Sequence, residues 1–508
     1  MLPTGAVCSI NHERQAASMK ITLYSPLDLN TLAVMAGGQL ILRGVSESMG
    51  VTHICTDSRE ADVNTLFCAI RGERVDGHDY IAKAASLGCS FFLCERLPDS
   101  LPSVCYAAIL VPDTVEALSR LAGARREGDL HDLPVVAVTG SVGKTTTKEM
   151  IYAVLSAAKN VFKKDGNYNS TIGLPLSFLE ISPTAEAAVL EMGMSSRGEI
   201  SAMTNAVCPD MAVVANVGTS HMEHLGTREN IARAKLEIAE GLREGGVLLI
   251  NGDEPLLSHL GQDFDGERPA IPQDIRILRL SLAGAENADY AVRNITVRDG
   301  GMGFALMTPA GLWQDLWIPA MGEHLVWAAA FAAAVGQLRG MTEGQVREGL
   351  VAYRPADMRQ NTRNVGGVTV IEDCYNAAPE SMKAALNVLH MTAASASATR
   401  RIAVLGDMKE LGTDTQTLHR GVGAEAVRQG IDLLVAVGEL GQYIAQGAIE
   451  AGLPAEAVHS VPATEDYPAA AEWLLGELRP GDCLLFKASR AMALERMAEA
   501  VTAELMHP

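Results

Sequence analysis

The feature that most constrains the fold is a strand followed by a glycine turn and a helix, in residues 135–148, VVAVTGSVGKTTTK. Four consecutive apolar residues, 135–138, predict a strand that is covered on both faces. Gly140 and Gly143 then allow a tight turn whose backbone N–H groups can converge on phosphate oxygens. The stretch therefore predicts a phosphate-binding loop at the edge of a parallel α/β sheet.

The residues after the turn can bind the phosphates of a nucleotide. Lys144 can reach the β- and γ-phosphates, and the Thr145 hydroxyl can bind magnesium. A helix whose positive end faces the anion is expected next, because apolar residues recur at helical spacing at Ile151, Val154, Leu155 and Ala158. The general pattern G-x-x-x-x-G-K-[ST] has glycine where this chain has Val138, so the loop is a shortened form. We predict that the chain binds ATP or GTP.

The bulk composition restricts the class of protein. A length of 508 residues predicts about three domains. The net charge of −20 argues against a nucleic-acid partner. The nine cysteines are scattered without a C-x-x-C pair, which favours a reducing cytoplasm over disulfides or zinc. We find neither a signal peptide nor an uncharged segment long enough for membrane insertion.

Short apolar segments alternate with helical patterns, which predicts an α/β fold with three domains. The first is a smaller α/β N-terminal domain, residues 1–130, in which 1–18 form a loose extension before an alternative start at Met19. The second, residues 131–341, is a central parallel sheet like that of phosphate-loop NTPases, and the third, residues 342–508, is Rossmann-like without a second nucleotide site. The expected strands of the last two are 135–138, 188–191, 211–216, 246–251, 368–373, 402–405, 433–437 and 483–486.

Candidate site residues follow two strands of the central domain. Glu191 ends its strand, where open α/β sheets place their ligands, and its carboxylate suits magnesium. Asn216, His221 and His224 share the loop after the next strand, and we interpret His224 as structural. Spacing alone predicts that Lys235 is an exposed helical lysine with a surface role.

Taken together, several segments resemble the Mur ligase family. They are 139–147 (TGSVGKTTT), 167–175 (NYNSTIGLP), 191–195 (EMGMS), His221, 234–238 (AKLEI), 373–382 (DCYNAAPESM) and 405–412 (LGDMKELG). The run 373–382 is typical of one member of the family, and 56–59 (TDSR), 67–72 (FCAIRG) and 76–78 (DGH) resemble that member's uridine-nucleotide-sugar domain. The resemblance covers the chain from about Met19 onward.

The resemblance implies an ATP-dependent, amide-forming ligase of peptidoglycan precursor synthesis. Its substrates would be UDP-N-acetylmuramoyl-tripeptide and D-alanyl-D-alanine, joined through an acyl phosphate without a protein nucleophile. The same resemblance implies a cytoplasmic enzyme, and because no heptad seam suggests obligate association, we expect a monomer. Because the acyl phosphate must be shielded from water, we expect hinges near residues 131 and 342.

The resemblance also implies roles for individual residues. Lys144, His221 and Lys235 would be catalytic, Thr145 and Glu191 would hold one Mg2+, and Glu191, His221 and a carbamoylated Lys235 would hold a second. The ATP-binding residues would be Gly140, Ser141, Val142, Gly143, Lys144, Thr145, Thr146, His324, Asp373 and Asn376. The substrate-binding residues would be Ser58, Arg59, Asp76, His78, Asn169, Tyr375, Lys487 and Arg490.

Two positions depart from the family pattern. In 322–328 (GEHLVWA), Ala328 stands where the family has an asparagine close to the adenine. Ala488 replaces the glycine of a Lys-Gly-Ser-Arg loop, which restricts the backbone to negative φ. Neither change removes the phosphate-loop lysine or a predicted metal ligand.

Three alternatives stay open at the level of the sequence. A sister Mur ligase or a folylpolyglutamate-type ligase would use another amine, and the run 373–382 argues against it. A GTPase or switch-like module would carry an Asn-Lys-x-Asp signal, which this chain lacks. A non-catalytic ATP binder would not need the intact set of Lys144, Glu191, His221 and Lys235.

Overall fold

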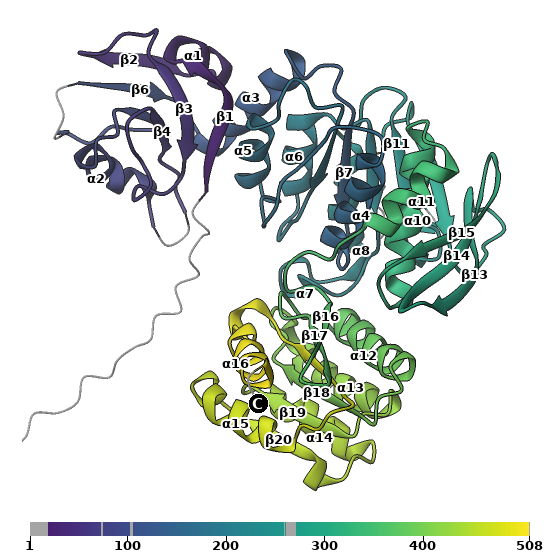
Figure 1. Ribbon diagram of the computed structural model, residues 1–508. Coiled ribbons are helices and arrows are strands. Elements are labelled where there is room, and N and C mark those ends of the chain that lie inside the picture. Colours follow the sequence, from purple (N-terminus) through teal and green to yellow (C-terminus); the bar gives the residue numbers. More distant parts are fainter. Residues whose placement is uncertain (1–18, 73–74, 102–104, 259, 261–270, 507–508) are drawn as a thin grey trace, which may run out of the picture. The chain divides into compact units, whose positions relative to one another are not determined.

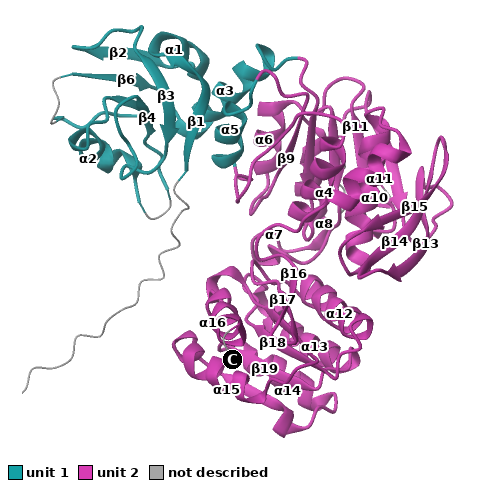
Figure 2. Cartoon of the chain, viewed as in Figure 1, with its two compact units in different colours: residues 1–131, 171–182 teal, residues 132–170, 183–508 magenta. Residues whose placement is uncertain are grey.

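The computed structural model describes residues 19–72, 75–101, 105–258, 260 and 271–506 (Figure 1). The expected loose extension, residues 1–18, lies outside the described residues. The chain divides into two compact units, one of residues up to 131 with 171–182 and one of 132–170 with 183–508 (Figure 2). Three sheets with helices between their strands confirm the α/β fold class.

The first unit is built on a six-stranded sheet. In sheet order its strands are β1 (Lys20–Asp28), β3 (Gly50–Cys55), β4 (Thr65–Cys68), β5 (Phe91–Cys94), β6 (Tyr106–Leu110) and β2 (Gln39–Arg43). The inner strands are parallel, and the outer pairs β1–β3 and β2–β6 are antiparallel. The helices are α1 (Leu29–Ala36), α2 (Ile81–Ser86), α3 (Thr114–Glu127) and α5 (Gly173–Leu179). The buried Arg125 of α3 ties α5 to this unit by donating to the carbonyls of Leu179 and Ile181.

The central sheet of the second unit has nine strands. In sheet order they are β15 (Gly311–Ile318), β14 (Gly301–Thr308), β13 (Tyr290–Arg298), β12 (Arg276–Ser281), β11 (Val247–Asn251), β10 (Met211–Val214), β7 (Val135–Thr139), β9 (Ala187–Glu191) and β8 (Val161–Lys163). All pairs from β8 to β13 are parallel, whereas β14 and β15 pair antiparallel. This antiparallel extension was not anticipated from the sequence.

The C-terminal sheet of the second unit has six strands. In sheet order they are β16 (Asn361–Val365), β17 (Val368–Glu372), β21 (Asp482–Lys487), β18 (Arg400–Gly406), β19 (Leu433–Val437) and β20 (Val458–Val461). Only β16, at one edge, is antiparallel to its neighbour. The carboxyl ends of β17, β18 and β21 therefore lie at one edge of the sheet, where Rossmann-like folds place their ligands.

Helices connect these strands (Figure 1). Around the central sheet they are α4 (Lys144–Ser156), α6 (Glu199–Val207), α7 (Met222–Leu225), α8 (Arg228–Leu236), α9 (Pro255–Ser258), α10 (Glu323–Leu338) and α11 (Glu343–Ala352). Around the C-terminal sheet they are α12 (Pro379–Ser395), α13 (Thr415–Arg428), α14 (Gly441–Glu450), α15 (Tyr467–Glu477) and α16 (Glu495–Met506). Among the described residues, no helix is long and apolar enough to cross a membrane.

The core beside the central sheet is formed by α4 and the alanine-rich α10. Ile151, Val154 and Leu155 of α4 are buried as expected, but α4 ends at Ser156, so Ala158 lies beyond the helix and is exposed. Small side chains let α10 approach closely, since a Cβ at Gly336 would come within 2.9 Å of a Val154 methyl group. The packing fixes the helix that follows the phosphate loop.

Candidate active site

The predicted phosphate loop connects β7 to α4, and its backbone is held by Asn216. Asn216 Oδ1 accepts from the N–H groups of Ser141 and Val142, at 3.0 and 2.9 Å, and its Nδ2 donates to the Val142 carbonyl at 2.7 Å. Gly143, with φ 79°, precedes α4 in the left-handed conformation that favours glycine. The Lys144 ammonium donates to the Gly140 carbonyl at 2.9 Å. The loop is thus preorganised, with the positive end of α4 facing the cavity described below.

Glu191, at the end of β9, meets the phosphate loop through Thr145. Thr145 Oγ1 donates to Glu191 Oε2 at 2.8 Å, and Asn169 Nδ2 donates to Oε1 at 2.8 Å. Burial alone raises the pKa of Glu191, but the cations Lys144 and Arg359 outweigh it, and the pKa is lowered. The carboxylate is therefore ionised at neutral pH, and with the Thr145 hydroxyl it offers the oxygen donors that magnesium prefers.

Lys235 is buried, which contradicts the expectation of an exposed helical lysine. Only 2% of Lys235 is exposed, because the face of α8 that carries it packs inward. Burial, and then the charge of Lys144, lower the pKa of Lys235 well below its ordinary value. A neutral amine is the form that can add CO2, so the carbamate implied by the family resemblance is chemically accessible here.

His221 takes up a left-handed conformation, with φ 66°, immediately before α7. Its Nδ1 lies 3.1 Å from Glu410 Oε2, an ion-pair distance without the alignment of a hydrogen bond. His224, interpreted as structural, is exposed. In the part of the chain that the structure describes, no group of three or more His, Cys, Asp and Glu could hold a metal ion. Of the predicted metal ligands, Thr145 and Glu191 contact each other through a hydrogen bond.

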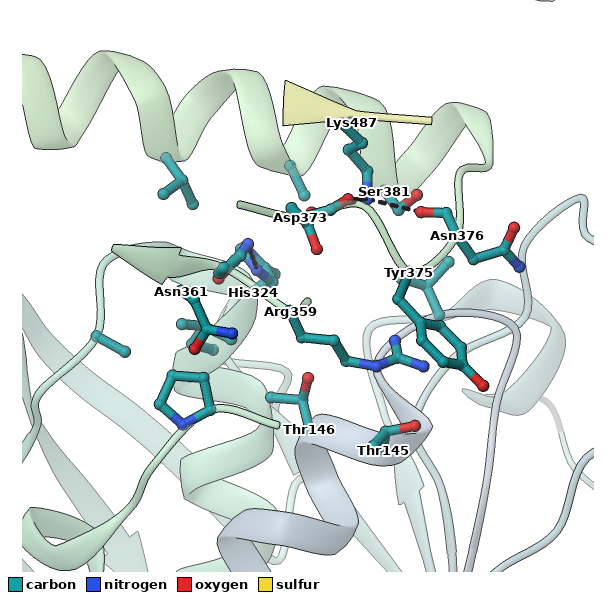
Figure 3. A pocket seen from close by; sticks show the side chains of 18 of the residues that line it. Thr145, Thr146, His324, Arg359, Asn361, Asp373, Tyr375, Asn376, Ser381 and Lys487 are labelled. Atoms are coloured by element: carbon teal, nitrogen blue, oxygen red, sulfur yellow. Dashed lines mark hydrogen bonds and ion pairs between the residues drawn. The ribbon is translucent and has the colours of Figure 1, made fainter. Parts of the chain in front are cut away.

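A cavity of about 670 Å³ extends from the phosphate loop to the C-terminal sheet (Figure 3). Of the predicted ATP- and substrate-binding residues, it brings together Ser141, Val142, Gly143, Lys144, Thr145, Thr146, Asn169, Glu191, His324, Asp373, Tyr375, Asn376 and Lys487. The volume and the mixed polar and apolar lining suit a nucleotide. Gly140, His221, Lys235 and Arg490 do not line it.

Asp373 and Lys487 form a buried ion pair at the carboxyl ends of β17 and β21. Lys487 Nζ lies 2.7 Å from Asp373 Oδ2 and donates to the Asn376 carbonyl at 2.9 Å. Lys487 therefore fixes both the strand end and the turn that follows it. Arg490, by contrast, is exposed and pairs with Glu495, so the structure places it outside the cavity wall.

His324 lies in the first turn of α10 and is neutral at physiological pH. Burial is the main cause that lowers its pKa to about 4. Its Nε2 lies 2.8 Å from Gln360 Nε2, which makes the ring nitrogen the acceptor in this contact. Ala328, one turn further on, is packed in the hydrophobic core and does not line the cavity. Ala488 is buried and has no left-handed backbone, so the replacement of glycine is tolerated there.

Arg359 is a site residue that the sequence analysis missed. Its guanidinium lies 4.2 Å from the centre of the Tyr375 ring, and the side chain extends toward that ring on the side of Thr145 (Figure 3). Its charge also helps to lower the pKa of Glu191. Arg359 has no local sequence signal, because it lies in the irregular segment between α11 and β16.

The remaining predicted substrate residues belong to the first unit. Ser58 is buried, and Arg59 is exposed and paired with Asp57. His78 has Nδ1 at 2.6 Å from Asp76 Oδ1, and its Nε2 accepts from the Glu95 N–H at 2.9 Å. Both ring nitrogens are thus engaged within the unit, and the proton sits on Nδ1.

Asp76 is the charged centre of this part of the first unit. The His78 N–H, and then the His78 ring and Arg96, hold the pKa of Asp76 far below its usual range. Arg71 and Arg96 both lie near Asp76 Oδ2, at 3.7 and 3.0 Å, and both are largely exposed. Arg71 also pairs with Glu95 and Arg96 with Asp79, so both guanidinium groups are held by carboxylates of their own unit.

Three family models match the chain. The Mur ligase family catalytic domain matches residues 50–126, the Mur ligase middle domain matches 138–336, and the glutamate ligase domain of Mur ligases matches 358–490. A relative from Bacillus subtilis, named UDP-N-acetylmuramoyl-tripeptide–D-alanyl-D-alanine ligase, is 38% identical over 88% of this chain and 92% of its own length.

Solved structures agree with these matches. A crystal structure of MurF from Acinetobacter baumannii superimposes with a TM-score of 0.81 at 29% identity, covering 95% of this chain and all of that one. MurF from Thermotoga maritima, solved in complex with ADP, gives a TM-score of 0.73 at 29% identity over 89% of this chain and 97% of that one.

Proposed function

Because this chain belongs to the Mur ligase family, we propose that it joins D-alanyl-D-alanine to the tripeptide carboxylate of UDP-N-acetylmuramoyl-tripeptide in an ATP-dependent reaction. The observation that carries the proposal is the Thr145–Glu191 pair, because it puts an ionised carboxylate against the phosphate loop inside a nucleotide-sized cavity. The B. subtilis relative bears the name of this activity, which favours it over a sister ligase with another amine.

We propose the acyl-phosphate chemistry that the family resemblance implies. The terminal carboxylate of the tripeptide attacks the γ-phosphorus of ATP, which releases ADP and leaves an acyl phosphate. The amine of D-alanyl-D-alanine then attacks the acyl carbon, the amide bond forms, and inorganic phosphate leaves with the former carboxylate oxygen. Lys144 and Arg359 are the cations placed to neutralise charge on the transferring phosphoryl group. The amine loses its proton during the second step, and no side chain is acylated.

The donor set fits magnesium, and we assign Thr145 and Glu191 to it. Magnesium would neutralise charge on the phosphate oxygens when bound. Lys235, whose pKa is strongly lowered by burial, would become an additional oxygen ligand by carbamoylation, and His221 would contribute a ring nitrogen. Asn169 orients the Glu191 carboxylate from the side opposite Thr145.

We assign the two nucleotide-containing substrates to different regions of the chain, ATP to the cavity and the UDP-sugar to the first unit. Asp373, Asn376 and His324 line the nucleotide cavity, together with Tyr375 and Lys487. In the first unit, we assign the UDP-sugar to Ser58, Arg59, Asp76 and His78, as the family resemblance implies. We propose that the enzyme is a cytoplasmic monomer, and the family resemblance supports the cytoplasmic location.

Release of phosphate by the purified full-length protein tests the function. The assay contains ATP, Mg2+, UDP-N-acetylmuramoyl-tripeptide and D-alanyl-D-alanine, and each component is left out in turn. The proposal predicts release only when all are present. Release that is independent of the dipeptide would refute the assignment of the amine, and no release with all components would refute the ligase.

A further inference from the structure

Two carboxylates from the region of the C-terminal sheet contact a single loop of the central sheet. The loop, residues 217–221, follows β10 and is called here the His221 loop. Glu380 lies in the first turn of α12, and Glu410 lies in the segment after β18. The loop is therefore held by side chains that do not belong to its own sheet.

Glu380 is the stronger of the two contacts. Its Oε1 accepts from the Thr219 N–H at 3.1 Å and from the Thr219 hydroxyl at 2.9 Å. Its other oxygen, Oε2, is buried without a hydrogen-bond partner among the described residues. A carboxylate oxygen that is buried without a partner lowers the stability of the fold. Glu380 therefore has a role other than stabilisation of the fold.

The His221 loop in turn rests on the phosphate loop. The Gly218 N–H donates to Ser141 Oγ at 2.8 Å. A Cβ built on Gly218 would come within 3.2 Å of both Ser141 Cβ and Glu380 Cδ, so Gly218 is enclosed between the phosphate loop and α12. A continuous set of contacts thus runs from α12 through Thr219 and Gly218 to Ser141.

Glu410 contacts the end of the same loop. Its Oε2 lies 3.1 Å from His221 Nδ1, and both residues have left-handed backbones, with φ 64° for Glu410 and 66° for His221. Such conformations persist in residues other than glycine when the surroundings impose them, and they gather at functional sites. With Nδ1 facing Glu410, the Nε2 atom of His221 is the one left to face a ligand.

We propose that Glu380 and Glu410 are positioning residues that hold the His221 loop against the phosphate loop. The C-terminal sheet then sets the position of His221 and steadies Ser141, in addition to lining the nucleotide cavity. Only the consequence for turnover rests on the proposed ligase function. The effect on the loop is a property of the protein without substrates.

Hydrogen–deuterium exchange of the full chain, read on peptides that cover residues 215–222, tests the proposal. The variant Glu380→Ala removes Oε1, the acceptor of both Thr219 hydrogen bonds, and is expected to speed exchange in these peptides about tenfold. Glu380→Gln keeps the acceptor Oε1 and should exchange like the unaltered protein. Lys383→Ala, an exposed position on the same helix, is the matched control and should also leave exchange unchanged.

Two further variants separate positioning from general destabilisation. Thr219→Val removes the hydroxyl donor from the other side of the contact and should speed exchange in the same peptides only. Glu410→Ala should speed exchange at the end of the His221 loop that contains His221. Unchanged exchange in Glu380→Ala, or equal effects of Glu380→Ala and Glu380→Gln, would overturn the proposal, as would faster exchange spread over the whole chain.

Kinetics provide the second readout. Glu380→Ala should lower kcat about tenfold with little change in the KM for UDP-N-acetylmuramoyl-tripeptide, and Glu380→Gln should restore most of it. Full kcat in Glu380→Ala would overturn the role in turnover. If the exchange results hold but the protein shows no ligase activity under any condition, the proposed function fails while the positioning of the loop stands.

Discussion

Thr145 Oγ1 donates a hydrogen bond of 2.8 Å to Glu191 Oε2, which joins the first turn of α4 to the end of β9. The two residues are 46 positions apart, and they meet because β7 and β9 are parallel neighbours whose carboxyl ends share an edge of the sheet. The pair supports our proposal that Glu191 is the carboxylate that faces the phosphates of a bound nucleotide.

The charge of Glu191 is expected to be essential. Glu191→Gln keeps an acceptor for Thr145 but removes the negative charge, so kcat should fall by about 10²–10³-fold, as for other preorganised electrostatic groups. Steady-state phosphate release measures it, with Glu244→Gln, at an exposed position of the same unit, as the control. Activity within a few-fold of the unaltered protein would show that Glu191 is not a metal ligand.

Lys235→Ala is expected to abolish most activity and to respond to chemical rescue. The variant would remove the proposed carbamate oxygens, and a small carboxylate such as formate or acetate can supply similar oxygens. Activity should rise with formate concentration in Lys235→Ala and stay constant in the unaltered protein. Full activity of the variant without added carboxylate would refute a carbamoylated lysine.

Protonation of His324 should weaken the fold at mildly acidic pH. Its pKa is about 4 in the folded protein, lowered mainly by burial, and is about 6.5 when unfolded. Between these values the unfolded chain binds the extra proton, so stability is full above pH 6.5 and falls as the pH drops toward 4. Urea unfolding should show a loss from pH 7 to pH 5 that is about 2 kcal/mol larger in the unaltered protein than in His324→Gln. Equal losses in both would exclude His324 as the cause.

Arg359 should contribute to nucleotide affinity through its planar, stacked guanidinium. Arg359→Lys keeps the charge but loses the stack on Tyr375, so the KM for ATP should rise about tenfold. Titration with an ATP analogue measures the same change without turnover. An unchanged affinity for the analogue would show that Arg359 does not contribute to nucleotide binding.

Breaking the Asp373–Lys487 pair should destabilise the C-terminal sheet. Asp373→Ala leaves the buried Lys487 ammonium without its carboxylate, at a cost of about 3 kcal/mol. Urea unfolding followed by circular dichroism would measure it, and the surface pair of Arg347 and Glu343 offers a control, since Glu343→Ala should cost less than about 1 kcal/mol. Equal effects of the two variants would contradict the importance of burial.

The strands around the candidate site could be predicted because each is a short apolar run with a polar residue at its end. Glu191 and Asn216 were placed in this way, whereas the role of Asp373 was predicted from the family resemblance. The strands β7, β9 and β19 have the expected positions to within about a residue. The hairpin β14–β15 was not predicted from the sequence, because its apolar and polar residues follow no clear alternation, as in GLWQDLWI of β15. Register shifts in both antiparallel pairs further obscure the period-two pattern.

What the sequence could not provide is burial that depends on distant partners. Lys235 sits in a helix with charged neighbours, and only the packing of α8 removes it from water. The role of Asn216 in holding the phosphate loop, and that of Arg359 beside Tyr375, likewise depend on contacts between segments far apart in the chain. Such residues carry no local pattern.

If the tripeptide carboxylate becomes an acyl phosphate, one of its two oxygens leaves with the inorganic phosphate. Isotope labelling of that carboxylate therefore distinguishes an acyl phosphate from other routes. UDP-N-acetylmuramoyl-tripeptide labelled with ¹⁸O in the terminal carboxylate is converted in the presence of ATP and D-alanyl-D-alanine, and the released phosphate is analysed by mass spectrometry. We expect that one ¹⁸O is transferred to each phosphate. Phosphate without ¹⁸O, formed alongside the amide product, would contradict it.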